Sequence, residues 1–515
     1  MKVTRWPAIL IFTLLIVASL IIQPDNEIPS NSELQKNQPS LVGDIKNLSS
    51  TWYCVAGSVG GAGLANHEIL IGNPSDAEST VRISVVSVLA PNQEDPNGDS
   101  GTTLLDVLQL PLVQKEFPIS PRAVTSVKLS EIDGVSGEYA AALIQSNLGS
   151  LIVEHRLAGA LGFAQSACAS TTSSEWNFAA GTTRLGTREM IFLFNPYPDS
   201  AVLDITFAAD GRTRRPDSYI GLVVPPQSLL PIDITSVVTL AQTISTQITA
   251  RTGRIVAERL VMFGDEIAPN GLDAEVGSPS LNDLWAFPGG MESEALVSLA
   301  IFNPSETAVA DVDIEIIPDV SNVGYIEPIS LAVPAASSRV VYFLFGQEGG
   351  DPSLIDASTR IAKGIPFWVV VRSTNGVPIA SERVLIAPSE GNLSSGYNRG
   401  VDVSAEKHYV ILQEPSGKVA IANPASDRLT LIQIKALSNG DIFSSQTIEI
   451  AAKSRKIIDL RQLGVPQDSI LEITSTEPVS IEKYIGTKNS GDWGNVSPAA
   501  GNVSDLYIRH QNLTS

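Results

Sequence analysis

An acid followed directly by a base recurs four times along the chain and is the first feature whose residue types could do chemistry. The pairs are Glu154-His155, Glu258-Arg259, Glu382-Arg383 and Glu482-Lys483. Adjacent strand residues point to opposite faces, so the two members of a pair cannot bind each other. A catalytic carboxylate is normally unique to one site, and glycosidases need two acids at a fixed separation in one cleft. The repetition therefore predicts a structural salt bridge across the sheet or between domains.

The only two cysteines are the next candidates. Cys54 and Cys168 lie about 114 residues apart, and in an exported chain they would form a disulfide that contributes about 2–5 kcal/mol to stability. The alternative is two unrelated buried thiols. Neither cysteine has a nearby histidine in the sequence that would make it a nucleophile.

Residues that could bind a metal or a phosphate lack the spacing that such sites need. His67, His155, His408 and His510 are scattered, with no His-x-x-x-His or mixed Cys/His pattern. The glycine-rich run 57–63 has no lysine and predicts a connection between strands instead of a phosphate loop.

A calcium loop is partly matched by Asp95, Asn97, Asp99 and Asp106. Its sixth position is Ser100 where glycine is required. A hydrated acidic loop is favoured, and the sequence predicts no metal or other cofactor.

The composition limits the partners. The 515 residues include 55 acids and 34 bases, for a net charge of −21. Attraction to nucleic acid or to an anionic lipid surface needs a surplus of Lys and Arg, so the sequence predicts no nucleic-acid partner. Contact with a membrane is expected through an N-terminal helix only, and the length predicts three or four domains.

That N-terminal segment has the pattern of an export signal. Lys2 and Arg5 precede an apolar run over 7–22. Because the run offers only a poor small-residue cleavage site, we expect an uncleaved anchor in the cell membrane with the bulk of the chain extracytoplasmic. A cleaved leader and a secreted protein are the alternative. Residues 23–50 are rich in Asn, Pro, Ser and Gln and predict a flexible tether.

The rest of the chain repeats one unit four times. An Asn-Pro dipeptide follows a short apolar strand in each copy, at Asn73-Pro74, Asn195-Pro196, Asn303-Pro304 and Asn423-Pro424. Proline cannot donate to a strand ladder and asparagine tolerates turn conformations, so the dipeptide ends one strand and opens a turn. Downstream of it, each copy carries a second turn and then one of the Glu-base pairs.

Short alternating runs between Gly, Pro and Asn turns are typical of tandem β-sandwiches. We therefore expect an all-β chain of four immunoglobulin-like sandwiches after the apolar helix and tether. The predicted boundaries are 51–170, 171–277, 278–400 and 401–515, and the last copy is divergent because it lacks the opening motif of the other three.

Tryptophans suggest a possible ligand. Trp52, Trp176 and Trp285 open the first three copies, and Trp493 lies in the last. These rings could stack on sugars, although a Trp at the start of a repeated strand is more often a core residue.

The segments 52–74 and 176–259 resemble an uncharacterised family of actinobacterial secreted or membrane-anchored envelope proteins. The resemblance implies an envelope location and no established activity. We expect an envelope scaffold or protein-interaction module whose partners are envelope proteins. A protein that binds cell-wall glycan is the alternative, and a hydrolase is the third possibility, because fold class alone grants no function.

Overall fold

The computed structural model describes residues 50–500 apart from 61–64, 90–106, 148–150, 160, 265–270, 290–295, 321–322, 344–354, 363, 390–391, 402–404, 413–417, 426 and 485–498. The described residues belong to one compact unit, Lys46–Ser515. The expected apolar helix and nearly all of the tether lie outside the described residues, as does Trp493. No described helix is long and apolar enough to cross a membrane.

The described residues form an all-β fold. Copy 1 contains β1 (Ser50–Cys54), β2 (Asn66–Asn73), β3 (Ser79–Leu89), β4 (Leu108–Gln109), β5 (Val113–Ile119), β6 (Ala123–Lys128), β7 (Tyr139–Ser146), β8 (Ile152–Gly159) and β9 (Gly162–Ala167). Copy 2 contains β10 (Glu175–Phe178), β11 (Thr187–Asn195), β12 (Ala201–Ala209), β13 (Arg212–Arg214), β14 (Ile220–Val224), β15 (Ser228–Asp233), β16 (Ile244–Thr252), β17 (Val256–Phe263) and β18 (Gly271–Val276).

Copy 3 contains β19 (Leu284–Phe287), β20 (Leu296–Asn303), β21 (Ala310–Pro318), β22 (Ile329–Val333), β23 (Ser337–Phe343), β24 (Ile355–Asp356), β25 (Phe367–Ser373), β26 (Ala380–Ser389) and β27 (Asn392–Arg399). Copy 4 contains β28 (Ala405–Leu412), β29 (Lys418–Asn423), β30 (Thr430–Ser438), β31 (Asp441–Ile450), β32 (Ser454–Asp459), β33 (Ser469–Tyr484) and β34 (Ala499–Ala500). The described part of the chain also contains the short 3-10 helices η2 (Leu129–Glu131), η3 (Asp217–Tyr219), η4 (Ile234–Ser236) and η5 (Leu460–Leu463).

Every copy distributes its strands over two sheets in the same order. In copy 1 one sheet runs β1-β7-β3, with β4 and β5 both paired to β3, and the other runs β6-β2-β8-β9. An immunoglobulin domain pairs its first strand with its second and its seventh with its sixth. Here the first strand, β1, pairs with β7, and β8 pairs with β2. The strand order therefore differs from that of the expected immunoglobulin-like fold.

Copy 4 keeps this order but joins two strands into one. The 16-residue strand β33 pairs with β28 and β30 through its first half and with β29 through its second half. It takes the place of β7 and β8 of copy 1, which are two separate strands. The long strand explains why both sheets of copy 4 are connected.

Apolar side chains fill the space between the two sheets of each copy. In copy 1, Ile69 and Ile71 of β2 pack with Ile83 and Val85 of β3, all of them buried. Alternate residues of a strand face the same side, so these residues lie on the face that points into the core. This arrangement is β-sandwich-like.

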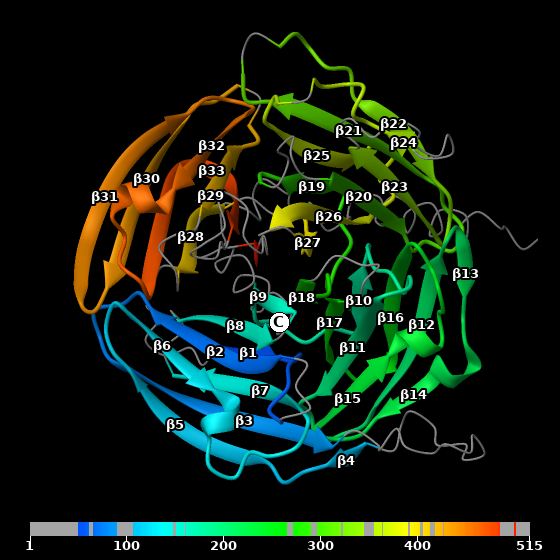
Figure 1. Ribbon diagram of the computed structural model, residues 1–515, viewed down its shortest axis with the longest axis vertical. Coiled ribbons are helices and arrows are strands. Elements are labelled where there is room, and N and C mark those ends of the chain that lie inside the picture. The colour runs from blue at the N-terminus through cyan, green and yellow to red at the C-terminus, as the bar shows by residue number, and fades with distance from the viewer. Residues whose placement is uncertain are drawn as a thin grey trace, which may run out of the picture. The chain divides into compact units, whose positions relative to one another are not determined.

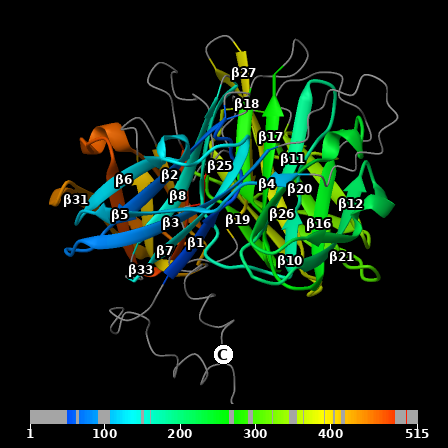
Figure 2. The same cartoon turned by 90° about the horizontal axis from the view of Figure 1, so that it is seen from below.

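Within the unit Lys46–Ser515 the four copies follow one another around a central axis (Figure 1). The last strand of each copy lies near that axis, because β9 contacts β18, β18 contacts β27, and β34 contacts both β27 and β9. Viewed from the side, β18 and β27 reach the same end of the unit (Figure 2). Copy 4 thus lies against copy 1, and the ring of copies is closed.

Candidate functional site

The repeated asparagines form the same clasp in every copy. Asn195 is fully buried, and its Nδ2 donates to the carbonyls of Asp199, Val224 and Pro225, at 2.8, 3.1 and 3.0 Å. Its Oδ1 accepts the backbone N–H of Tyr197 at 3.0 Å. Asn73, Asn303 and Asn423 make equivalent contacts. One amide side chain therefore joins two turns, with Pro74, Pro196, Pro304 and Pro424 each directly after it.

The opening tryptophans are core residues. Trp52, Trp176 and Trp285 are 3%, 1% and 0% exposed. The indole Nε1 of Trp176 donates to the carbonyl of Ile255 at 3.0 Å, and that of Trp285 donates to the carbonyl of Ile379 at 2.9 Å. Their buried rings offer no face to a sugar, so these three residues do not support the alternative of glycan stacking and have the core position that the repeated strand start favours.

The Glu-base pairs meet at the contacts between copies. Glu382 of copy 3 accepts the backbone N–H groups of Ala179 and Ala180 of copy 2, each at 3.0 Å. The guanidinium of Arg259, also in copy 2, donates to the same carboxylate at 2.9 Å. Both residues are buried, since Glu382 is 2% exposed and Arg259 is 1% exposed. The glutamate of one copy thus neutralises the base of the preceding copy.

Three further contacts follow the same rule. Glu258 accepts from Val55 and Ala56 at 2.9 Å and contacts His155 of copy 1. Glu482 accepts from Gly289 at 2.5 Å and pairs with Arg383 of copy 3 at 3.1 Å. Glu154 accepts from Ile411 at 3.3 Å and pairs with Lys483 of copy 4. The last of these contacts joins the two ends of the ring.

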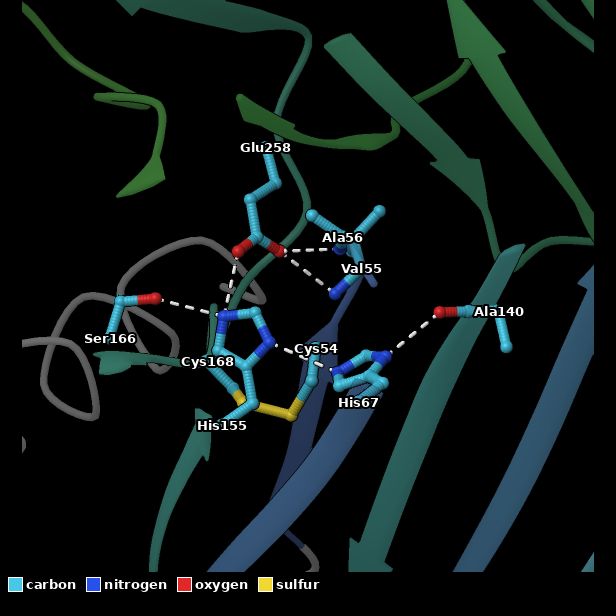
Figure 3. The surroundings of a disulfide bond; sticks show 9 residues. All are labelled: Cys54, Val55, Ala56, His67, Ala140, His155, Ser166, Cys168 and Glu258. Atoms are coloured by element: carbon cyan, nitrogen blue, oxygen red, sulfur yellow. Dashed lines mark hydrogen bonds and ion pairs between the residues drawn. A yellow bond between two sulfur atoms is a disulfide. The ribbon is translucent and has the colours of Figure 1, made fainter. Parts of the chain in front are cut away.

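Copy 1 adds a disulfide to its interface with copy 2 (Figure 3). Cys54 of β1 is bonded to Cys168, which follows β9, with a Cα–Cα distance of 4.7 Å. This confirms the pairing predicted from sequence. Both residues are buried beside His155, and a chain of contacts runs from Glu258 through His155 and His67 to the carbonyl of Ala140.

The hydrogen bonds of this chain fix where its protons lie. The Nδ1 of His67 must donate to the Ala140 carbonyl at 3.0 Å, so a neutral His67 accepts at Nε2 from Nδ1 of His155 at 3.0 Å. Burial and the neighbouring His155 hold the pKa of His67 well below 6.5, which keeps it neutral. The Nε2 of His155 lies 2.7 Å from Oε1 of Glu258. This contact links the His67–His155 pair of copy 1 to copy 2.

Ser166 completes a Ser-His-Glu group that does not have the geometry of a hydrolase triad. Its Oγ lies 2.8 Å from Nε2 of His155, the same nitrogen that contacts Glu258. A triad needs the hydroxyl and the carboxylate on different ring nitrogens. The three side chains are also buried, so a substrate could not reach the hydroxyl without separating copies 1 and 2.

The interface between copies 2 and 3 holds additional carboxyl groups. Glu189 and Asp273 are buried near Arg259, and burial raises the pKa of each to about 7 while Arg259 opposes that shift. Glu275 lies opposite Arg259 on β18, and burial raises its pKa too. These three acids lie with Glu382 among the guanidinium groups of Arg259 and Arg399, and their raised pKa values make this interface a place where protons are bound. Sequence reasoning did not single out these acids.

In copies 2 and 3 a phenylalanine and a glycine stand where copy 1 has its two bonded cysteines. Cys54 occupies the position of Phe178 and Phe287, and Cys168 occupies that of Gly277 and Gly400. A Cβ on Gly277 would lie 2.8 Å from Phe178, and one on Gly400 would lie 2.8 Å from Phe287. Each pair therefore fills one space, either with a ring over a glycine or with two bonded sulfurs. The paired exchange was present in the sequence and could have predicted the contact.

A comparison with known protein families finds a match for part of the chain. Residues 136–343 match a family of unknown function (DUF5719). This stretch is similar to that family. It covers less than half of the chain and includes the whole of copy 2. The Glu-base pairs within it are Glu154-His155 of copy 1 and Glu258-Arg259 of copy 2. The match supports an uncharacterised domain, and no curated protein matches the chain.

Proposed function

We propose that this protein is a rigid scaffold of the cell envelope, held to the membrane by its N-terminal apolar segment and presenting an extracytoplasmic ring to envelope proteins. The observation that carries the proposal is the fourfold use of one buried Glu-base contact between copies. Such contacts fix the relative positions of domains and leave no reacting group accessible. The protein acts without catalysis and without a cofactor.

The disulfide supports the location. Disulfides form and persist in oxidising compartments and are rare in the cytosol. The bond between Cys54 and Cys168 is buried, so it suits a chain that folds after export. In this proposal the protein belongs to an actinobacterial family of envelope proteins. Its four copies are tandem β-sandwiches with the boundaries expected from sequence.

Two measurements test the proposal. Protease treatment of intact cells should cleave the bulk of the chain from outside, and mass spectrometry of the non-reduced protein should find the cysteines bonded. A chain protected inside the cytosol with two free thiols contradicts the location.

Chemical cross-linking in the native envelope tests the scaffold role. Wild-type protein should yield a reproducible set of envelope proteins, and Glu154→Ala, which opens the ring, should lose them. A matched control is Glu116→Gln, because the pair of Glu116 with Arg82 is exposed at the surface. An unchanged set of partners in Glu154→Ala contradicts the requirement for a closed ring.

A further inference from the structure

A cavity of about 220 Å³ lies where copies 2 and 3 meet. Both copies line it, copy 2 with Arg184, Thr243 and Phe263 and copy 3 with Ser298, Ala300 and Tyr342, among others. Arg184, Ser298 and Tyr342 are half-buried, so the lining is open to solvent. The cavity is therefore accessible without separation of the two copies.

Two of its residues are small where the preceding copy has large ones. Ser298 and Ala300 lie five and three residues before the repeated asparagine of copy 3. Met190 and Phe192 occupy the same two positions in copy 2, on the strand β11 that is equivalent to β20.

A third small residue, Thr243, takes the place of Tyr139. The residue that follows each of them donates its backbone N–H to the glycine of the opening motif, to Gly57 at 3.1 Å in copy 1 and to Gly181 at 2.9 Å in copy 2. The two positions are thus equivalent in the fold.

The three large side chains fill the interface between copies 1 and 2. The rings of Tyr139 and Phe192 meet edge to face, 5.4 Å apart, and the Tyr139 hydroxyl donates to Sδ of Met190 at 3.9 Å. All three are buried. Between copies 2 and 3 the corresponding space lacks two rings and a thioether. A cavity of roughly 150 Å³ lined by apolar side chains binds benzene, so this one has room for an aromatic ring with a short substituent.

The lining combines aromatic rings with one cation. Phe263 and Tyr397 are stacked, with their ring centres 5.8 Å apart. The guanidinium of Arg184 lies over Phe263, 6.0 Å from the ring centre. Among the described residues that line the cavity, Arg184 alone is charged, and it forms no ion pair with a described carboxylate. A guanidinium matches the planar, bidentate geometry of a carboxylate.

Two carboxylates contact the lining from outside it, and backbone donors already bind both. Glu189 accepts the N–H of Thr182 at 2.7 Å. Asp210 accepts the N–H groups of Gln242 and Thr243 at 3.0 and 3.1 Å. Neither carboxylate neutralises Arg184 through a direct contact, so the guanidinium is left for a ligand.

We propose that this cavity binds a small aromatic carboxylate. The ring of the ligand takes the space that Tyr139 and Phe192 fill at the preceding interface, and its carboxylate pairs with Arg184. This binding site goes beyond the scaffold role and does not depend on it.

Phenylacetate tests the site, with the neutral phenylacetamide as the matched ligand. Saturation-transfer NMR on the full-length protein in detergent should detect phenylacetate, and phenylacetamide should bind about tenfold more weakly because it lacks the charge-assisted hydrogen bonds. Arg184→Gln should weaken phenylacetate about tenfold and leave phenylacetamide unchanged. No binding of phenylacetate, or equal affinity for the two ligands in the wild type, overturns the proposal.

Arg254→Gln is the matched control for the loss of a positive charge. Arg254 is exposed and follows the end of β16 that is remote from Thr243, so this variant should bind both ligands as the wild type does. An equal loss of phenylacetate in Arg254→Gln and Arg184→Gln would reduce the effect to net charge and overturn the assignment of Arg184.

Filling the cavity tests its location independently of charge. Ser298→Met with Ala300→Phe restores the side chains of copy 2 and should abolish binding of both ligands, while thermal unfolding checks that the protein is folded. Ala300→Phe alone is a smaller change and should weaken both ligands. A folded variant with the cavity filled that binds phenylacetate as the wild type does overturns the proposal.

Discussion

Glu154 forms a buried ion pair with Lys483, a residue 329 positions later in the chain. The pair joins copy 1 to copy 4 and repeats the contact that Glu258, Glu382 and Glu482 make with the copies before them. Burial lowers the pKa of Lys483, and the attraction of Glu154 opposes that shift. The chain therefore closes on itself through the same chemistry that links its successive copies.

Removing one partner of this pair should open the ring. Glu154→Ala leaves the ammonium of Lys483 buried without its carboxylate, which we expect to destabilise the protein by about 3–5 kcal/mol. Glu154→Leu combined with Lys483→Met should recover most of the loss, because two apolar side chains need no compensation. Chemical denaturation measures both variants. A single variant as stable as the wild type contradicts a role of the pair in closure.

The exposed pair of Arg82 and Glu116 is the matched control for that experiment. Its side chains are 53% and 60% exposed, so Glu116→Gln should change the free energy of unfolding by less than about 1 kcal/mol.

Replacing the disulfide in two ways should separate the stability that comes from the covalent bond from the stability that comes from filling the space. Cys54→Ala with Cys168→Ala removes both, and we expect a loss of about 2–5 kcal/mol. Cys54→Phe with Cys168→Gly recreates the arrangement of Phe178 with Gly277 and should recover part of that loss. Thermal unfolding under non-reducing conditions compares the three proteins. If the Phe-Gly variant is less stable than the Ala-Ala variant, the two arrangements are not equivalent.

The interface between copies 2 and 3 should become less stable as the pH rises. The folded-state pKa values of Glu189 and Asp273 are about 7, above the usual 4.5 and 3.8. The folded protein then holds protons that the unfolded chain has released, so stability is lost between about pH 4 and pH 7. Amide exchange of Ala179 and Ala180, corrected for its intrinsic pH dependence, should show less protection at about pH 8 than at about pH 5. Glu189→Gln with Asp273→Asn and Glu275→Gln should remove this difference.

The interface between copies 1 and 2 should respond in the opposite direction. The pKa of His67 is lowered well below 6.5 by burial and by His155, so the unfolded chain takes up a proton below that pH that the folded protein excludes. Stability from this residue is therefore lost as the pH falls through 6.5. Protection of the Val55 and Ala56 amides should decrease at acid pH, and His67→Gln should abolish the decrease. An acid response that persists in His67→Gln contradicts this origin.

Replacing a buried asparagine of the Asn-Pro repeats should lower the free energy of unfolding more than replacing an exposed asparagine. Asn195→Ala removes the hydrogen bonds to three carbonyls and from one N–H group, of which the carbonyl of Pro225 still accepts from Ser228 Oγ, and we expect a loss of about 1–3 kcal/mol. Asn66→Ala, at an exposed position of β2, should change the free energy of unfolding by less than about 0.5 kcal/mol. Urea denaturation compares the two variants, and equal effects contradict the clasp.

The sequence allowed the all-β class and the disulfide to be predicted, because alternating runs, turn residues and two cysteines are local signals. It also placed Glu258 and Arg259 on opposite faces of one strand. It could not say which base each glutamate meets, because Glu258 binds His155 of the copy before it and Arg259 binds Glu382 of the copy after it. Those choices depend on how whole sandwiches pack. The immunoglobulin strand order was wrong for a similar reason, since alternation along β8 does not specify whether β2 or β7 lies beside it.

Closure of the ring is tested most directly by a distance between copies 1 and 4 in solution. The carbonyl of Gly440 accepts from Arg122 at 2.9 Å, so spin labels placed at residues 122 and 439 should lie close together. Both native cysteines are bonded, which leaves engineered cysteines free for labelling. Pulsed electron paramagnetic resonance should give one narrow, short distance in the wild-type background and a broader, longer one in Glu154→Ala. A broad, long distribution in the wild-type background would mean that the copies are strung out as separate domains, and it would contradict the closed ring.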